Sequence, residues 1–270
     1  MNNIIETLEY RGFDINIYQD EMAESPRDWD NIGKMVCKHR DYYLGDPIGK
    51  IEGNIGRRDR FPKNAEEVVE TILAGAVGET KAANIRQAWE YGTGNVKGSF
   101  VSRGLYIASK LLPVIMPLYL LDHSGLWMRC GQNGDVGLDK YNIFQVDPGC
   151  WDTSLVGWIY CTWKDVKLEY GKGPEALGKA ENYLRGEVET YSDYLSGAVY
   201  GYEIEPKEGN KVHCDDSCWG FYGYKWNENG LKEMAEGSID CAIKQYKEDT
   251  VKAYREKVLT RNFMKTCWAD

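Results

Sequence analysis

The chain has 270 residues, 43% of them hydrophobic and 28% charged, as in an ordinary globular protein. Acidic residues outnumber basic ones by 42 to 33, and the formal net charge of −9 argues against direct binding of a nucleic-acid backbone. The longest apolar run, residues 111–121, is about half as long as a membrane-spanning helix and contains two prolines, so the sequence predicts no membrane partner.

The N-terminal residues show no basic region followed by an apolar stretch, so the sequence predicts no signal peptide. We therefore expect the protein to stay in the cytoplasm of the cell that makes it. In that compartment the eight cysteines are expected to be reduced thiols rather than disulfides.

Strand patterns open the chain and helix patterns follow. The elements predicted there are strands over residues 9–19 and 33–37, a Gly-rich, basic loop over 46–63, and helices after residue 64, over 80–91 and over 97–112. Asn64 is a suitable N-cap, because its side chain can accept a hydrogen bond from the first turn of a helix. Residues 46–112 are therefore predicted to form a helical insertion between two sheet elements.

The second part of the chain returns to strands and ends in a long helix. The elements predicted there are a hairpin of residues 114–121 and 126–129, a central strand over 155–163, helices over 164–171 and 175–195 with a break or kink near Gly186, a second hairpin of 199–205 and 211–213, a final strand over 219–225, and a helix over 230–261. Strands followed by segregated helices favour an α+β class: an antiparallel β-sheet core with a helical insertion and a long C-terminal helix. The predicted domains are a core of residues 1–45 and 113–226, the insertion 46–112, and a C-terminal helical extension 227–270.

Short segments rich in Trp, Asp and Gly interrupt these elements. They read SPRDWDN at residues 25–31, DHSG at 122–125, WDTS at 151–154 and DSCWGFYG at 216–223. Large aromatic residues beside Asp, Ser and Gly are typical of tight turns closed by side-chain hydrogen bonds and a buried ring. Trp29, Trp151 and Trp219 are therefore predicted to be buried parts of the scaffold.

These segments, together with YRGFDINIYQD at 10–20, PLYLLDHSG at 117–125, VGWIY at 156–160 and RGEVETY at 185–191, are similar to a family of phage and mobile-element proteins without an assigned function. The similarity covers residues 8–45 and 113–225 in the family's order. The two-part layout also resembles the phage inhibitors of the Gabija nuclease–ATPase defence complex, which oligomerise around their target. The resemblance implies a phage-encoded anti-defence protein that binds and inhibits a host immune complex and forms a homo-oligomer.

An enzyme is the less favoured alternative, and its candidate residues lie in the turn segments. Asp122, His123 and Ser124 are the residue types of a catalytic triad, but neighbours on a strand point to opposite faces, so a capped turn is the favoured interpretation. Asp152 and Asp216 are a candidate carboxylate pair. A hydrolase or nucleotide-modifying enzyme using Asp122, His123, Asp152 and Asp216 stays open, as does a virion or assembly component.

His213, Cys214 and Cys218 come nearest to a metal-binding pattern, with Cys150 or Cys161 as a further ligand from elsewhere in the chain. Structural zinc takes four ligands, usually from two tight pairs, and no Cys-x-x-Cys pair occurs. We therefore expect no metal and no cofactor.

The insertion and the terminal helix carry aromatic residues among charges. We expect these aromatic residues to be exposed and to bind a partner: Trp89, Tyr91, Phe100, Tyr106, Tyr246 and Tyr254, joined by Phe263 and Trp268 near the C-terminus. That composition suits docking onto another protein or onto a second copy of the chain. The alternative is that each element simply packs on the sheet.

Overall fold

The computed structural model describes residues 3–51, 60–93, 99–136 and 143–267, except for the side chains of Thr93, Ser99 and residues 262–267. The chain forms two compact units, residues 1–24 with 197–270, and residues 25–196. Each unit has its own four-stranded antiparallel sheet, which confirms the α+β class. The bounds of these units differ from those of the predicted core, residues 1–45 and 113–226. The reason is that residues 13–19 pair with residues 200–206 and not with residues 33–37.

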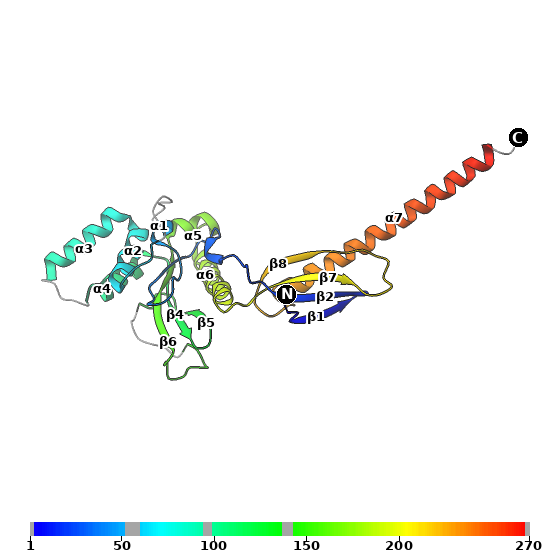
Figure 1. The fold of residues 1–270 in the computed structure, drawn as a ribbon. Coiled ribbons are helices and arrows are strands. Elements are labelled where there is room, and N and C mark those ends of the chain that lie inside the picture. The colour runs from blue at the N-terminus through cyan, green and yellow to red at the C-terminus, as the bar shows by residue number, and fades with distance from the viewer. Residues whose placement is uncertain (1–2, 52–59, 94–98, 137–142, 268–270) are drawn as a thin grey trace. The chain divides into compact units, whose positions relative to one another are not determined.

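The first sheet has the order β1-β2-β7-β8 (Figure 1). Its strands are β1 Glu6–Tyr10, β2 Phe13–Gln19, β7 Val199–Pro206 and β8 Ser217–Tyr222. The single strand predicted over residues 9–19 is instead a hairpin, because Arg11 and Gly12 adopt φ of 48° and 83° and reverse the chain. The partner of β7 is β8, whereas residues 211–213 lie outside the strands.

Helix α7, Leu231–Cys267, covers one face of this sheet with its first turns, and it confirms the predicted long C-terminal helix. Leu231, Ala235 and Ile239 recur every four residues and therefore share one side of the helix. They are buried against the inward side chains of β2 and β7, among them Ile15 and Tyr202.

The second sheet has the order β3-β6-β4-β5. Its strands are β3 Lys34–Cys37, β6 Thr153–Cys161, β4 Val114–Asp122 and β5 Leu126–Cys130. As predicted, β4 and β5 form a hairpin, whose turn uses positive φ at Ser124 and Gly125. Strand β6 lies between β3 and β4, so the prediction of a central strand is also confirmed.

Helices cover both faces of the second sheet (Figure 1). On one face lie α2 Ala65–Val77 and α4 Ser99–Leu111, and on the other α5 Trp163–Tyr170 and α6 Pro174–Leu195. Helix α3 Glu79–Thr93 packs on α2, and the short helix α1 Ile48–Ile51 lies inside the predicted loop. Asn64 caps α2 by accepting a hydrogen bond from the amide of Glu67, as predicted. Helix α6 runs without a break through Gly186. Residues 52–59 of the loop, and Lys97 at the expected start of the third helix, lie outside the described residues.

The three tryptophans of the turn segments are not buried. Trp29 is 42% exposed, Trp219 is 40% exposed and Trp151 is 87% exposed, so the prediction of a buried scaffold role is wrong for these rings. The turn at Trp151 is closed by a carboxylate instead, because Asp147 accepts hydrogen bonds from the amides of Trp151 and Asp152. Polar side chains, rather than aromatic rings, therefore hold this turn.

No helix in the part of the chain that the structure describes combines the length and the apolar character that crossing a membrane requires.

Candidate functional site

The turn between β4 and β5 brings two of the predicted catalytic residues together. Nδ1 of His123 lies 2.8 Å from Oδ2 of Asp152, and both side chains are exposed. The amide of Asp122 donates to the carbonyl of Asp152 at 3.0 Å, which fixes the end of β4 beside the segment that enters β6. The hydrogen bond to the carboxylate engages Nδ1 and so orients the imidazole, whereas Nε2 takes no part in it.

Asp147 holds the segment that presents Asp152. Its carboxylate accepts hydrogen bonds from the amides of Trp151 and Asp152 and, at 2.7 Å, from Oγ1 of Thr153. These donors favour the ionised form of Asp147 and so lower its pKa. The largest contribution is the hydrogen bond from the side chain of Thr153.

The Asp147→Asn variant is expected to lose part of the acid sensitivity of the wild type. A carboxyl whose pKa is lowered by folding stabilises the protein above its ordinary value of 3.8 and loses that contribution as the pH falls through the lower folded value. Urea unfolding measured between about pH 2 and pH 6 should therefore show a shallower decline of the unfolding free energy for the variant. Parallel declines in the two proteins would contradict this role for Asp147.

The other catalytic candidates do not complete a site around His123. Asp216 belongs to the compact unit of residues 1–24 and 197–270, whereas His123 and Asp152 belong to the other unit. Ser124 adopts φ of 57° within the turn. Among the described residues, no hydroxyl or thiol is hydrogen-bonded to the imidazole of His123. Within the described ranges, the geometry thus provides an oriented base without a positioned nucleophile.

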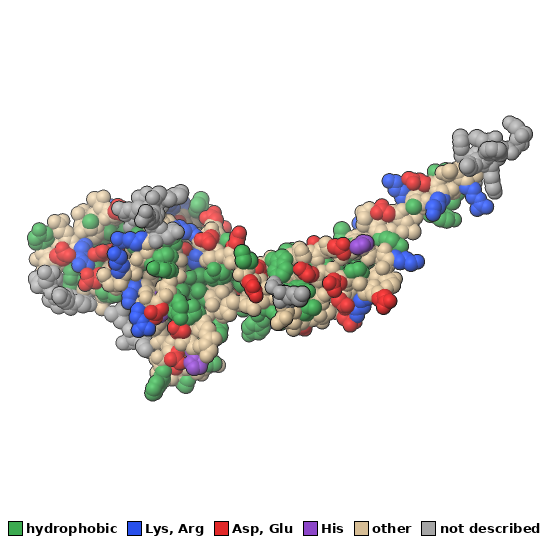
Figure 2. Space-filling model, viewed as in Figure 1, with side chains coloured by type: hydrophobic (Ala, Val, Ile, Leu, Met, Phe, Trp, Pro, Cys, Tyr) green, Lys and Arg blue, Asp and Glu red, His purple; other side chains and the backbone are tan. Residues whose placement is uncertain are grey.

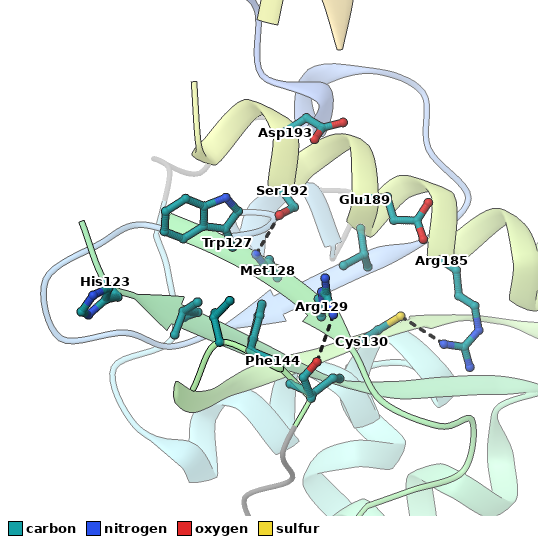
Figure 3. A pocket seen from close by; sticks show the side chains of 14 residues that line it. His123, Trp127, Met128, Arg129, Cys130, Phe144, Arg185, Glu189, Ser192 and Asp193 are labelled. Carbon is teal, nitrogen blue, oxygen red and sulfur yellow. Dashed lines mark hydrogen bonds between the residues drawn. The ribbon is translucent and has the colours of Figure 1, made fainter. Parts of the chain in front are cut away.

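A cleft between β5 and α6 adjoins His123 and has a volume of about 870 Å³. Figure 3 shows side chains of β5 on one side and side chains of α6 on the other, with Phe144 on the side of the strands. Its lining includes Trp127, Met128, Arg129, Phe144, Val146, Arg185, Glu189 and Asp193. Ser192 closes one part of the strand edge, because its Oγ accepts a hydrogen bond of 2.9 Å from the amide of Met128.

The two arginines of the cleft are held by neighbouring groups. Arg129 lies over the ring of Phe144, 5.2 Å from its centroid, and donates to the carbonyl of Ile143. Arg185 donates to the carboxylate of Glu181 at 2.8 Å and to the carbonyl of Gly131 at 3.2 Å. Arg185 is therefore paired with a carboxylate, whereas Arg129 has only neutral partners among the described residues and keeps its positive charge on the strand side of the cleft.

Two carboxylates on α6, Glu189 and Asp193, stand one helical turn apart on the wall of the cleft. Neither forms an ion pair with any residue that the structure describes. Burial raises the pKa of Asp193, and the charge of Glu189 adds to the rise. This side of the cleft is therefore under-neutralised and favours a cation from outside.

The thiol of Cys130 reaches the cleft but is not an activated nucleophile. Burial raises the pKa of Cys130 and outweighs the opposing effect of the Arg185 guanidinium, 3.4 Å from the sulfur. The thiol therefore stays protonated at neutral pH.

The predicted metal ligands do not converge. Nδ1 of His213 pairs with the carboxylate of Asp215 at 3.3 Å, while Cys214 is buried. Within the described ranges, no group of three or more His, Cys, Asp or Glu side chains is arranged to hold a metal ion.

The predicted partner-binding aromatics separate into exposed and buried residues. Tyr91, Tyr106, Tyr246 and Tyr254 are exposed, and Trp89 is partly buried against the helical core. Phe100 is only 4% exposed and packs in that core, so its assignment to the surface is corrected. The side chains of Phe263 and Trp268 lie outside the described residues.

Apart from His123, the residues that shape the cleft were not predicted from the sequence. The one signal that marks them is the spacing of Glu189 and Asp193, which places two carboxylates four residues apart on one helix face. The apolar side of the cleft, which includes Met128 and Phe144, is marked by no comparable pattern in the sequence.

Comparisons with family models, with curated proteins and with solved structures give no match for this chain.

Proposed function

We propose that this protein acts by binding another protein, and that the cleft between β5 and α6 receives a segment of its target. The observation that carries the proposal is the cleft: about 870 Å³, an exposed indole from Trp127, and two carboxylates without a cation partner among the described residues. Concave pockets of this type receive the few side chains that dominate the energy of a protein interface.

The charges of the cleft define the segment that fits it. A Lys or Arg side chain can lay its aliphatic stem along Met128 and Phe144 and direct its charged head toward Glu189 and Asp193. Arg185 is paired with Glu181, and Arg129 on the strand side keeps its charge, so the incoming cation is favoured beside the carboxylates of α6. The target segment is therefore basic and carries an apolar residue beside its cation.

The target itself is proposed from the two resemblances of the sequence. The motifs are similar to phage and mobile-element proteins without an assigned function, and the two-part layout resembles the phage inhibitors of the Gabija nuclease–ATPase complex, which makes that complex the first candidate to test. Inhibition by binding requires no catalytic residues, which agrees with an imidazole that has no positioned nucleophile among the described residues.

The variants Val146→Asp and Glu189→Lys are each expected to weaken binding of the purified protein to a purified Gabija complex by about tenfold or more. Val146 is 81% exposed at the cleft, so an added charge disturbs the docking surface and not the core. Leu168→Asp is the matched control, because Leu168 is 82% exposed on α5, outside the cleft. Binding should be measured by surface plasmon resonance. Equal dissociation constants for the cleft variants and the control would sink the proposal.

A hydrolase is the second candidate function, and the hydrogen bond between His123 and Asp152 favours it. An imidazole oriented through Nδ1 can use Nε2 to take a proton from water. The His123→Gln variant separates the candidates when affinity and activity are both measured: because His123 lines the cleft, inhibition by a pure binding protein changes only as far as its affinity changes. Loss of biological activity with unchanged folding and unchanged affinity would support the hydrolase.

A further inference from the structure

The second half of α7 extends beyond the sheet that its first half covers (Figure 1). Every side chain from Lys244 to Arg261, here named the distal segment, is exposed. Val251, Tyr254 and Val258 recur at spacings of three and four residues and so form one apolar stripe. A solitary helix is marginally stable in water, so a stripe of this kind indicates a surface that packs on something.

The distal segment is basic although the chain is acidic. It contains six Lys and Arg residues against three Asp and Glu residues, a net charge of +3 in a chain of net charge −9. Figure 2 shows several of the basic side chains along this part of α7. Two distal segments would therefore repel each other, and the segment calls for an acidic surface.

The first sheet presents such an acidic surface on the face opposite α7. Side chains alternate along a strand, so Ile15 and Ile17 face α7 while Asp14 and Tyr18 face the other way. The same alternation on β7 directs Glu203 outward, two residues before Glu205. The outer sheet face is defined by Glu9, Asp14, Tyr18, Glu203, Glu205 and Trp219.

Charge on the outer sheet face is only partly compensated. Lys207 lies 2.7 Å from Glu9 and 3.3 Å from Asp14. Glu203 and Glu205 have no ion pair with any residue in the described part of the chain, although Asn16 donates to Glu205 at 3.1 Å. The face therefore keeps an excess of negative charge at its centre.

An exposed aromatic area lies beside these carboxylates. The rings of Tyr18 and Trp219 are 6.2 Å apart, and Trp219 lies over Gly201, where any larger side chain would displace it. This area suits an apolar stripe flanked by cations, because indole and phenol rings attract both.

We propose that the distal segment of one copy lies across the outer sheet face of a second copy. An 18-residue helix is about 27 Å long, close to the ~26 Å of an eight-residue strand. The stripe of Val251, Tyr254 and Val258 packs on Tyr18 and Trp219, and the basic side chains pair with Glu203 and Glu205. If each copy gives its helix to the other, the two identical contacts close a symmetric dimer.

Charge reversal on each surface tests the pairing. Sedimentation velocity over a concentration series should show a species heavier than the 30.8 kDa monomer for the wild type. The sheet variant Glu203→Lys/Glu205→Lys and the helix variant Lys247→Glu/Arg255→Glu should each be monomeric. An equimolar mixture of the two variants should associate again, because each helix then meets a sheet face of opposite charge.

Lys164→Glu/Lys179→Glu is the control for the helix variant, since it makes the same change of charge on exposed positions of α5 and α6 and should associate like the wild type. Circular dichroism checks that each variant is folded. A monomeric wild type, or variants that are folded but not restored by mixing, would overturn the proposal. So would a monomeric wild type whose distal segment binds phosphatidylserine vesicles.

Discussion

Replacing Arg27 with methionine is expected to lower the free energy of unfolding by about 3–5 kcal/mol, the usual cost of removing one partner of a buried ion pair. The guanidinium lies 2.6 Å from Oδ2 of Asp46 and 2.8 Å from Oε2 of Glu187, and all three residues are buried. It also donates to the carbonyl of Gly33 at 2.6 Å. Methionine would leave the buried carboxylate of Glu187 without its cation, and Asp46 with Lys50, whose Nζ lies 3.7 Å from Oδ1 of Asp46.

The pH dependence of the Arg27→Met variant supplies a second test. Burial already raises the pKa of Glu187, and the Arg27 guanidinium opposes that rise. Removing the guanidinium raises the pKa further, so the folded variant takes up a proton at a higher pH. The destabilisation should therefore become smaller as the pH is lowered.

Urea unfolding of Arg27→Met is best compared with that of Arg40→Met. Arg40 pairs with Asp41 at the surface, where solvent screening leaves an ion pair with little effect on stability. A similar loss in the two variants would refute the role given to the buried cluster.

Replacing Gly157 with alanine is expected to cost about 3 kcal/mol or more, the upper range for an overpacked core. A Cβ at this position of β6 would lie 2.0 Å from the carbonyl oxygen of Val36 and 2.8 Å from Cα of Cys37. Both are backbone atoms of the paired strand β3, so no side-chain rotation relieves the clash. The pairing of β3 with β6 must open instead.

Gly178→Ala is the matched control for that substitution. Gly178 lies on the exposed side of α6, where an added Cβ meets nothing within 4 Å. Alanine should stabilise the helix by about 0.5–1 kcal/mol, because glycine loses more conformational freedom on folding. The Tm measured by thermal unfolding should then fall for Gly157→Ala and rise for Gly178→Ala. A wild-type Tm for Gly157→Ala would contradict the clash.

Part of the candidate site was predicted from the sequence. His123 and Asp152 were named as chemically competent residues, and the structure joins them by a hydrogen bond. Asp216 was named with them but belongs to the other compact unit. The cleft was not foreseen, because Trp127 of β5 and Glu189 of α6 become neighbours only when the helix packs against the edge strand.

The sequence by itself determined the caps, turns and helices that depend on residues a few positions apart. Asn64 caps α2 through the amide of a residue three positions later. The DHSG segment makes the β4–β5 turn, in which Ser124 and Gly125 both adopt positive φ. Glycine adopts such a φ without steric cost. The apolar spacing of α7 marks a helix whether or not a partner is present.

Only the tertiary structure decided which distant elements pair. Strand β2 could pair with any strand of matching alternation, and its partner β7 was selected by the core that both share with α7. Arg27 and Glu187 lie 160 positions apart, and neither residue type predicts burial by itself. Burial of either side chain becomes favourable only when the fold supplies the opposite charge beside it. The sequence therefore determined the individual elements, whereas their packing determined the two units and the cleft.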